Sequence, residues 1–380
     1  MTGTDARTQF EKLKSYLEHD PENANLLRDS AEAALEAGMM PDAHSLYAKL
    51  EQLSELDERD RANAGLAAMR SGHASAAADH FLSLLETHPG DPALTYNLAH
   101  SMALAGEYEA AAERLDDATV DALPQAAMLR LQLVHQDGEF EAAQAMIPAM
   151  LERHGHYGPL LAAVSVLAMD TGDEDLARRC AEQAGELPDA ITTLATLKLG
   201  EHDPRTAQAM FLRALALNPG PQPRAVVGLG LAAMASGDLD SARTHLDRGA
   251  ALFTDHLGSW IASGWVHLLA GDRTTARERF QHALDLDPNF AESHGSLAVV
   301  ELLEGEPQSA RRRIDMASRL DRASFAAALA RSMDQAVGGD TETAKRILEM
   351  AMTQPIDEDG RTLAEALSAT TLAAKGRDFN

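Results

Sequence analysis

Apolar and small residues recur along the chain at the spacing of an amphipathic helix. In residues 257–290, Trp260, Gly264 and His267 stand at positions i, i+4 and i+7, which places them on one helix face. Ala276 and Phe280 repeat the i, i+4 spacing in the second half of the same segment. The pattern therefore predicts two consecutive helices in this segment.

The residues between these two predicted helices are typical of a helix end and a helix start. Gly271 stands where a residue in the left-handed conformation ends a helix, and Asp272 is placed to cap the following one. Pro288 interrupts helical structure before the next segment begins. Residues 257–290 are thus expected to form a helix-turn-helix unit.

The same unit recurs along almost the whole chain, and a marker glycine gives its period. Six of the eight intervals between markers are 34 residues, and one of 65 spans two units, with His202 at the missing glycine. The markers are Gly38, Gly72, Gly106, Gly138, Gly172, Gly237, Gly271, Gly305 and Gly339. Five residues after each marker position, His202 included, stands an alanine: Ala43, Ala77, Ala111, Ala143, Ala177, Ala207, Ala242, Ala276, Ala310 and Ala344. Such a period indicates a repeat protein.

The period divides the chain into ten repeats with a cap at each end. Residues 1–23 are expected to form an N-terminal capping helix, and residues 359–380 a C-terminal capping helix and tail. The predicted repeats are 24–57, 58–91, 92–123, 124–157, 158–187, 188–222, 223–256, 257–290, 291–324 and 325–358. They form one continuous domain, because a single hairpin cannot bury its own apolar face whereas a stack can.

The pattern resembles the tetratricopeptide repeat, which has a small residue at position 8, a large one at position 24 and a proline near the end. Gly264, Phe280 and Pro288 match these positions in residues 257–290. The resemblance covers about residues 24–358 and is weakest in residues 124–187. It implies an all-α fold, a right-handed α-solenoid (superhelix) of helix-turn-helix repeats.

The charge of the chain restricts its partners. There are 59 acidic and 33 basic residues, so the formal net charge is −26 at pH 7. A field of this sign repels phosphate, which disfavours nucleic acid and anionic membrane surfaces as partners. The run Arg311, Arg312 and Arg313 is expected to be a solvated face paired locally, for example with Asp315, or else a docking spot for an acidic partner.

Membrane insertion and secretion are not expected. No apolar run reaches the ~18 residues that a spanning helix needs. The first residues show no basic head followed by an apolar stretch, the pattern of a secretory signal. The expected location is the cytoplasm.

Motifs for catalysis or cofactor binding are missing from the sequence. There is no G-x-x-x-x-G-K-[ST] loop, no H-E-x-x-H and no C-x-x-C, and the repeats leave no stretch of the usual size of a catalytic domain. His154 and His156 form the densest histidine pair, but without a third ligand they are expected to be solvated loop residues. Cys180 is expected to be a partly packed thiol, although Arg178 and Arg179 could lower its pKa. We predict a protein that is not an enzyme and has no cofactor and no metal site.

The family resemblance implies a binding groove lined by the first helices of the repeats. Carried over by repeat position, the early repeats supply polar residues: Asn63, Arg70, Tyr96, Asn97, His100 and Gln132. The later repeats supply apolar residues: Leu231, Met234, Ile261, Trp265, Leu268, Leu269, Val299 and Leu302. Trp265 is expected to anchor a partner, because tryptophan often dominates interface energy. The alternative is that tight curvature, or a C-terminal helix over residues 360–375, covers this apolar stripe.

The predicted function is non-catalytic protein binding. We expect a scaffold or adaptor that holds a peptide or helix of another protein in its concave groove. The alternative is a self-associating structural subunit, hence a homo-oligomer, or an accessory factor of a secretion, pilus or envelope-polysaccharide assembly machine. Binding of a chaperone C-terminus through the family's carboxylate clamp is not expected, because only Arg28 and Asn63 match the clamp and Glu32 would repel a carboxylate.

Overall fold

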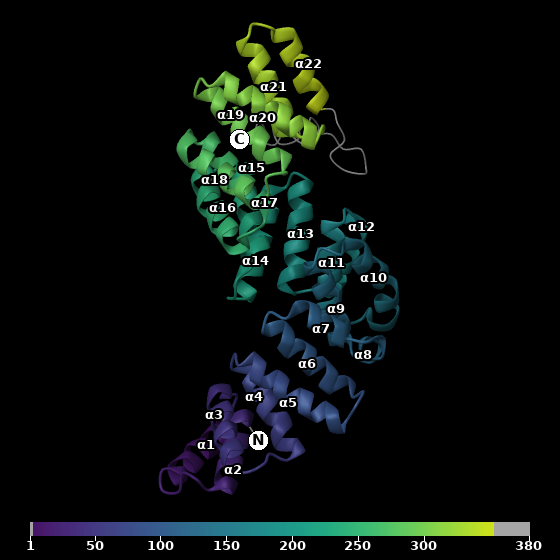
Figure 1. Ribbon diagram of the computed structural model, residues 1–380, viewed down its shortest axis with the longest axis vertical. Helices are drawn as coiled ribbons and strands as arrows, with labels where there is room; N and C mark the ends of the chain where they lie inside the picture. The colour runs from purple at the N-terminus through teal and green to yellow at the C-terminus, as the bar shows by residue number, and fades with distance from the viewer. Residues whose placement is uncertain (1–2, 353–380) are drawn as a thin grey trace, which may run out of the picture. The chain divides into compact units, whose positions relative to one another are not determined.

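The computed structural model describes residues 3–352, and in that range the chain forms 22 helices and no strand (Figure 1). This confirms the predicted all-α class. The described chain divides into two compact units, residues 1–167 and residues 168 onward, which are treated separately below. The expected helix at 360–375 lies outside the described residues.

Unit 1 contains ten helices, and an eleventh contains the boundary between the units. They are α1 (Gly3–Leu17), α2 (Ala24–Glu36), α3 (Met40–Leu53), α4 (Glu58–Arg70), α5 (Ala74–Thr87), α6 (Pro92–Leu104), α7 (Tyr108–Arg114), α8 (Asp117–Ala122), α9 (Pro124–Gln136), α10 (Phe140–His154) and α11 (Gly158–Asp170).

Unit 2 continues the pattern of paired helices. Its helices after α11 are α12 (Glu174–Ala184), α13 (Pro188–Gly200), α14 (Pro204–Leu217), α15 (Pro223–Ala235), α16 (Leu239–Phe253), α17 (Leu257–Leu269), α18 (Arg273–Leu286), α19 (Ala291–Leu303), α20 (Pro307–Leu320), α21 (Phe325–Val337) and α22 (Thr341–Met352).

The turn between the two helices of a repeat follows from the marker glycine. Gly271 has a φ of +87°, a conformation that costs an L-residue with a side chain but not glycine. The amide of Asp272 then reaches back to the carbonyl of His267 at 2.9 Å, and its carboxylate accepts a hydrogen bond from the amide of Thr275 at 3.0 Å. At the one position without glycine, His202 adopts a φ of +62°.

Small residues on first helices let large residues of second helices fill the space between them. A Cβ added to Gly65 would stand 2.8 Å from Cζ of Phe81, and one added to Gly264 would stand 2.5 Å from Cδ1 of Phe280. Both phenylalanines are fully buried. The small residue at position 8 and the large residue at position 24 of a repeat therefore pack directly against each other, and this contact recurs along the stack.

Contacts between neighbouring repeats show which helices lie on the inner side of unit 2. The first helices α13, α15, α17 and α19 each contact the next first helix, whereas the second helices α14, α16, α18 and α20 make at most marginal contact with one another. The crossing of α19 and α21 is the tightest, because a Cβ on Gly295 would lie 2.6 Å from the carbonyl carbon of Ala326. The stack in unit 2 therefore curves with its first helices inside.

The repeat at 92–123 differs from the expected pair of helices. After α6, the chain forms two short helices, α7 and α8, in place of one long second helix. The break falls at Leu115 and Asp116; Leu115 stays buried, while Asp116 accepts a hydrogen bond from the amide of Thr119 at 2.7 Å and caps α8. A strong N-cap inside a helical segment favours a new start over continuation.

Charged side chains join helices within a repeat and between repeats. Within the repeat 291–324, buried Glu301 of α19 accepts a hydrogen bond from Nε of Arg313 of α20 at 2.6 Å. Nε of Arg311 lies 2.8 Å from a carboxylate oxygen of Asp334. The expected pairing of Arg311 with Asp315 is therefore wrong, because an acidic residue of the next repeat is within reach and is better shielded from water.

Candidate functional site

The apolar stripe predicted on the first helices of unit 2 is divided by burial. Leu231 and Met234 on α15, and Ile261 on α17, are half-buried and pack against core clusters that include residues of the next repeat. Val299 on α19 is only 3% exposed, so it stabilises the packing and presents almost no surface to a partner. Leu269 is 61% exposed. The structure therefore separates residues that the sequence grouped together.

Three successive first helices contribute side chains to one apolar cluster, termed here the inner cluster. Trp265 and Leu268 of α17, Leu302 of α19, and Leu329 and Met333 of α21 are all partly buried and pack on the same core. Such a partly exposed cluster spans repeats because the first helices lie side by side. The cluster can stabilise the stack and still contact a partner.

The indole of Trp265 has a structural role as well as an exposed part. Its ring meets that of Phe280 edge to face, with centroids 5.6 Å apart. Phe280 is fully buried at the centre of the repeat. Truncation of Trp265 would therefore affect both the fold and any binding surface.

A row of exposed apolar side chains borders the inner cluster. Leu269, Leu303 and Val337 are the last residues of α17, α19 and α21, and they are 61%, 38% and 77% exposed. Since these three positions are 34 residues apart, they occupy the same place in three successive repeats. Val337 is not in the stripe predicted from the sequence, although the repeat period would have found it.

The polar residues predicted in unit 1 lie on three first helices. Asn63 is half-buried and Arg70 exposed on α4; Asn97 is half-buried on α6; Gln132 is exposed on α9. Hydrogen bonding of these residues to a peptide stays a prediction.

Tyr96 and His100 on α6 form a local pair. The tyrosine hydroxyl lies 3.4 Å from Nδ1 of the imidazole, and the ring centroids are 5.5 Å apart. Burial raises the pKa of Tyr96 and lowers the pKa of His100. Both side chains are therefore neutral near pH 7, which suits hydrogen bonding rather than charge recognition.

The one cation that matched the family's carboxylate clamp, Arg28, is used within the fold. Nε of Arg28 donates to Oδ2 of Asp60 at 2.6 Å, and Asp60 is 1% exposed. The pKa of Arg28 is raised mainly by this hydrogen bond. Because removing Arg28 from the pair would leave a buried carboxylate uncompensated, this cation is not available to a ligand.

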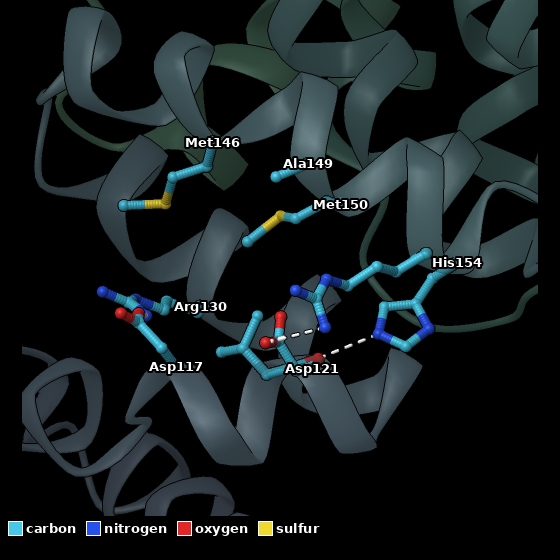
Figure 2. Close-up of a pocket in the computed structure, with 9 residues that line it drawn as sticks. Asp117, Asp121, Arg130, Met146, Ala149, Met150 and His154 are labelled. Carbon is cyan, nitrogen blue, oxygen red and sulfur yellow. Dashed lines mark hydrogen bonds and ion pairs between the residues drawn. The ribbon is translucent and has the colours of Figure 1, made fainter.

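A pocket opens beside the broken second helix of residues 92–123. Its volume is about 320 Å³, and Figure 2 shows Met146, Ala149 and Met150 of α10 facing Asp117 and Asp121 of α8 across it. The remaining lining residues are Val120, Arg130, Arg153 and His154. Sequence reasoning missed this site, because a pocket arises from a packing irregularity and not from a motif.

His154 corrects one prediction from the sequence. It is the last residue of α10, is 7% exposed, and its Nε2 lies 2.9 Å from the carbonyl oxygen of Val120 (Figure 2). The expectation that it is solvated in a loop is wrong, because the short helix α8 ends with a free carbonyl that the imidazole reaches. His156 is exposed, as expected.

No other chemistry is visible in the described part of the chain. Burial raises the pKa of the Cys180 thiol, despite the opposing effect of Arg179, so it is not an activated nucleophile. Among the described residues, no cluster of three or more histidine, cysteine or acidic side chains could hold a metal ion. None of the described helices is long and apolar enough to cross a membrane.

Comparison with solved structures supports the fold. The chain is similar to a chain in the crystal structure of the APC/C hetero-tetramer Cut9–Hcn1, with a TM-score of 0.56 and 17% sequence identity, covering 77% of this chain. It spans only 59% of that chain's length. Two crystal structures of MamA align with TM-scores of 0.34 and 0.36 at 17% and 18% identity, covering 48% and 44% of this chain and 96% and 93% of theirs. No curated protein matches.

Comparison with models of protein families identifies the family of the chain. The tetratricopeptide repeat family matches residues 63–127, 192–255 and 261–325, together just over half of the chain. The unmatched stretch between the first two regions includes most of residues 124–187, where the repeat pattern is weakest in the sequence. The stacked helical hairpins are the architecture of a protein-interaction scaffold. The chain therefore belongs to the tetratricopeptide repeat family.

Proposed function

We propose that this protein is a non-catalytic adaptor that holds a peptide or helix of another protein against the first helices α17, α19 and α21. One observation carries the proposal: three successive repeats each place an exposed apolar residue, Leu269, Leu303 or Val337, beside the partly exposed inner cluster. Isolated exposed apolar residues are ordinary on a protein surface, whereas a continuous row next to a hydrophobic cluster is typical of an interaction site.

The inner side of a curved stack suits an elongated ligand. Neighbouring packed helices are about 8–10 Å apart, and an α-helix advances about 10 Å in seven residues. A helical partner with apolar residues at i and i+7 would therefore meet equivalent positions of successive repeats. The absence of catalysis and the location in the cytoplasm stay predictions.

The exposed row gives a cleaner test than Trp265, because its side chains contribute little to the core. The triple variant Leu269→Ser, Leu303→Ser and Val337→Ser should lose most partner binding while keeping the circular dichroism spectrum of the unaltered protein. A matched control replaces Leu217, Leu252 and Leu286 by serine, since these leucines are 49%, 38% and 42% exposed but lie at the ends of second helices.

Binding is measured by photo-crosslinking in cells of the source organism. A benzophenone side chain is placed at position 303 or at position 286, and crosslinked proteins are quantified by mass spectrometry. A partner that crosslinks at position 303 and disappears when Leu269 and Val337 are serine, but not when Leu217 and Leu252 are serine, supports the proposal. Equal crosslinking at both positions contradicts it, and crosslinks only to a second copy of the chain favour the self-associating alternative.

A further inference from the structure

The two elements that face each other across the pocket, α8 and α10, each depart from a regular repeat helix. The second helix of residues 92–123 is divided into α7 and α8. Pro148 stands inside α10, where it lacks the amide hydrogen that a helix interior uses. Val120 of α8 and the neighbours of Pro148, Ala149 and Met150, line the pocket. The pocket belongs to unit 1, whereas α17, α19 and α21 belong to unit 2.

The polar groups that line the pocket already have partners. Arg130 lies 2.6 Å from Asp117, and Arg153 lies 2.8 Å from Asp121. His154 is held by the carbonyl of Val120. A ligand would therefore find no buried polar group to satisfy, and the surface left for it is that of apolar groups.

Two methionines, whose side chains are flexible, form much of the apolar lining. Val120 and Met150 are buried, while Met146 is half-buried and Ala149 exposed at the opening. Methionine adapts to side chains of different shape, which suits a site that receives one apolar group from outside. A volume of about 320 Å³ is ample for one leucine, methionine or phenylalanine side chain.

The surroundings of the pocket are strongly acidic. Residues 107–153 contain ten acidic residues and only three basic ones, and two of those three are the paired Arg130 and Arg153. The side chain of Asp117 at the rim is 91% exposed. Positive charge on a ligand would be attracted, and negative charge repelled, within about 10 Å at 0.1 M salt.

We infer that this pocket is a second protein-binding site, which takes one large apolar side chain of a partner segment flanked by lysine or arginine. The apolar side chain enters between Met146 and Met150. The flanking cations lie near the exposed carboxylate of Asp117 and are attracted by the acidic excess of residues 107–153, since Asp117 and Asp121 themselves are already paired with arginines. The site is independent of the first-helix surface, so either can fail without the other.

Disulfide exchange measures occupancy of the pocket directly. Ala149→Cys puts a thiol at the opening of the pocket, and Ala142→Cys puts one at an exposed position outside it on the same helix. Both variants are equilibrated with the capped peptide Cys-Gly-Lys-Leu-Lys, supplied as its mixed disulfide with glutathione, in a buffer of reduced glutathione, so that the protein thiol displaces glutathione as the leaving thiol. Adducts are counted by intact mass spectrometry. The unaltered protein shows whether buried Cys180 reacts.

Two further peptides separate the apolar contribution from the charge contribution. One carries serine in place of leucine, and the other carries glutamate in place of both lysines. The leucine–lysine peptide should form about fivefold more adduct at position 149 than at 142, as expected for partial burial of a leucine side chain. The serine peptide should form equal amounts of adduct at positions 149 and 142. The glutamate peptide should form less adduct at position 149 than the leucine–lysine peptide does, and this difference between the two peptides should be smaller in 0.5 M salt.

A variant that fills the pocket completes the test. Met146→Trp in the Ala149→Cys protein should abolish the preference while leaving the helical circular dichroism unchanged. Equal adduct formation at positions 149 and 142 for all three peptides would overturn the inference. A preference for the glutamate peptide, or persistence of the preference after Met146→Trp, would overturn it as well.

Discussion

Replacement of Gly264 by alanine tests the packing contact on which every repeat depends. A Cβ at this position would stand 2.5 Å from Cδ1 of Phe280, far inside the normal separation of two carbon atoms of about 3.5–4 Å. Phe280 is 0% exposed and in edge-to-face contact with Trp265, so its ring has no space into which to withdraw. The helices α17 and α18 must therefore move apart.

The size of the effect is a balance of two terms. Overpacking of a well-filled core costs about 1–3 kcal/mol. Alanine in place of glycine favours a helix interior by up to about 1 kcal/mol. We expect Gly264→Ala to lower the free energy of unfolding by about 1–2 kcal/mol, against the usual stabilising effect of this substitution in a helix.

Urea unfolding followed by tryptophan fluorescence reports on this repeat. Trp260 and Trp265 are the two tryptophans of the chain, and both lie on α17. Circular dichroism at 222 nm follows the whole stack in the same samples. The fluorescence transition should move to lower urea by at least as much as the circular dichroism transition, because the disturbed contact lies beside both indoles.

A control on the same helix isolates the steric term. Gly258→Ala would place its Cβ 3.2 Å from Cε1 of His256, a contact that a shift of a few tenths of an ångström relieves while the ring keeps its hydrogen bond from the amide of Ser259. This variant should stay within about 0.5 kcal/mol of the unaltered protein. The reasoning is refuted if Gly264→Ala is as stable as Gly258→Ala, or if adding Phe280→Leu to Gly264→Ala recovers none of the loss.

Two other predictions concern the positive φ of His202 and the lowered pKa values of three half-buried histidines. His202→Gly should raise the free energy of unfolding by about 1 kcal/mol in urea titration, because glycine relieves a φ of +62°; an unchanged midpoint would argue against strain there. Burial lowers the pKa of His44, His80 and His100, so as the pH falls below about 6.5 the unfolded chain takes up protons more readily than the folded one. The thermal unfolding midpoint should therefore decrease as the pH is lowered from 7.5 to 5.5. An unchanged midpoint over that interval would contradict the lowered pKa values of these histidines.

The architecture of the repeats was predictable from the sequence because its causes are local. A glycine at the end of a helix, an aspartate at the start of the next and small residues at helical spacing act within one repeat of 34 residues. Gly264 and Phe280 are 16 positions apart, so their contact is set by a single hairpin. The family and the all-α class follow from the repetition of such short-range contacts.

The accessibility of the candidate sites was decided by the tertiary structure. The same stripe contains Val299 at 3% exposure and Leu269 at 61%, because the crossing of α19 and α21 closes over one and leaves the other free. Arg28 is engaged by Asp60 from the next repeat, and His154 by Val120, 34 residues away.

The sequence by itself thus determined the helix-turn-helix unit, the small and large residues that pack inside it and how often it repeats, since these depend on neighbours within one hairpin. The tertiary structure alone decided which apolar residues stay exposed and where a pocket opens. Burial at those places depends on the angle and distance between successive hairpins, and these are set by the combined packing of side chains from three or more repeats.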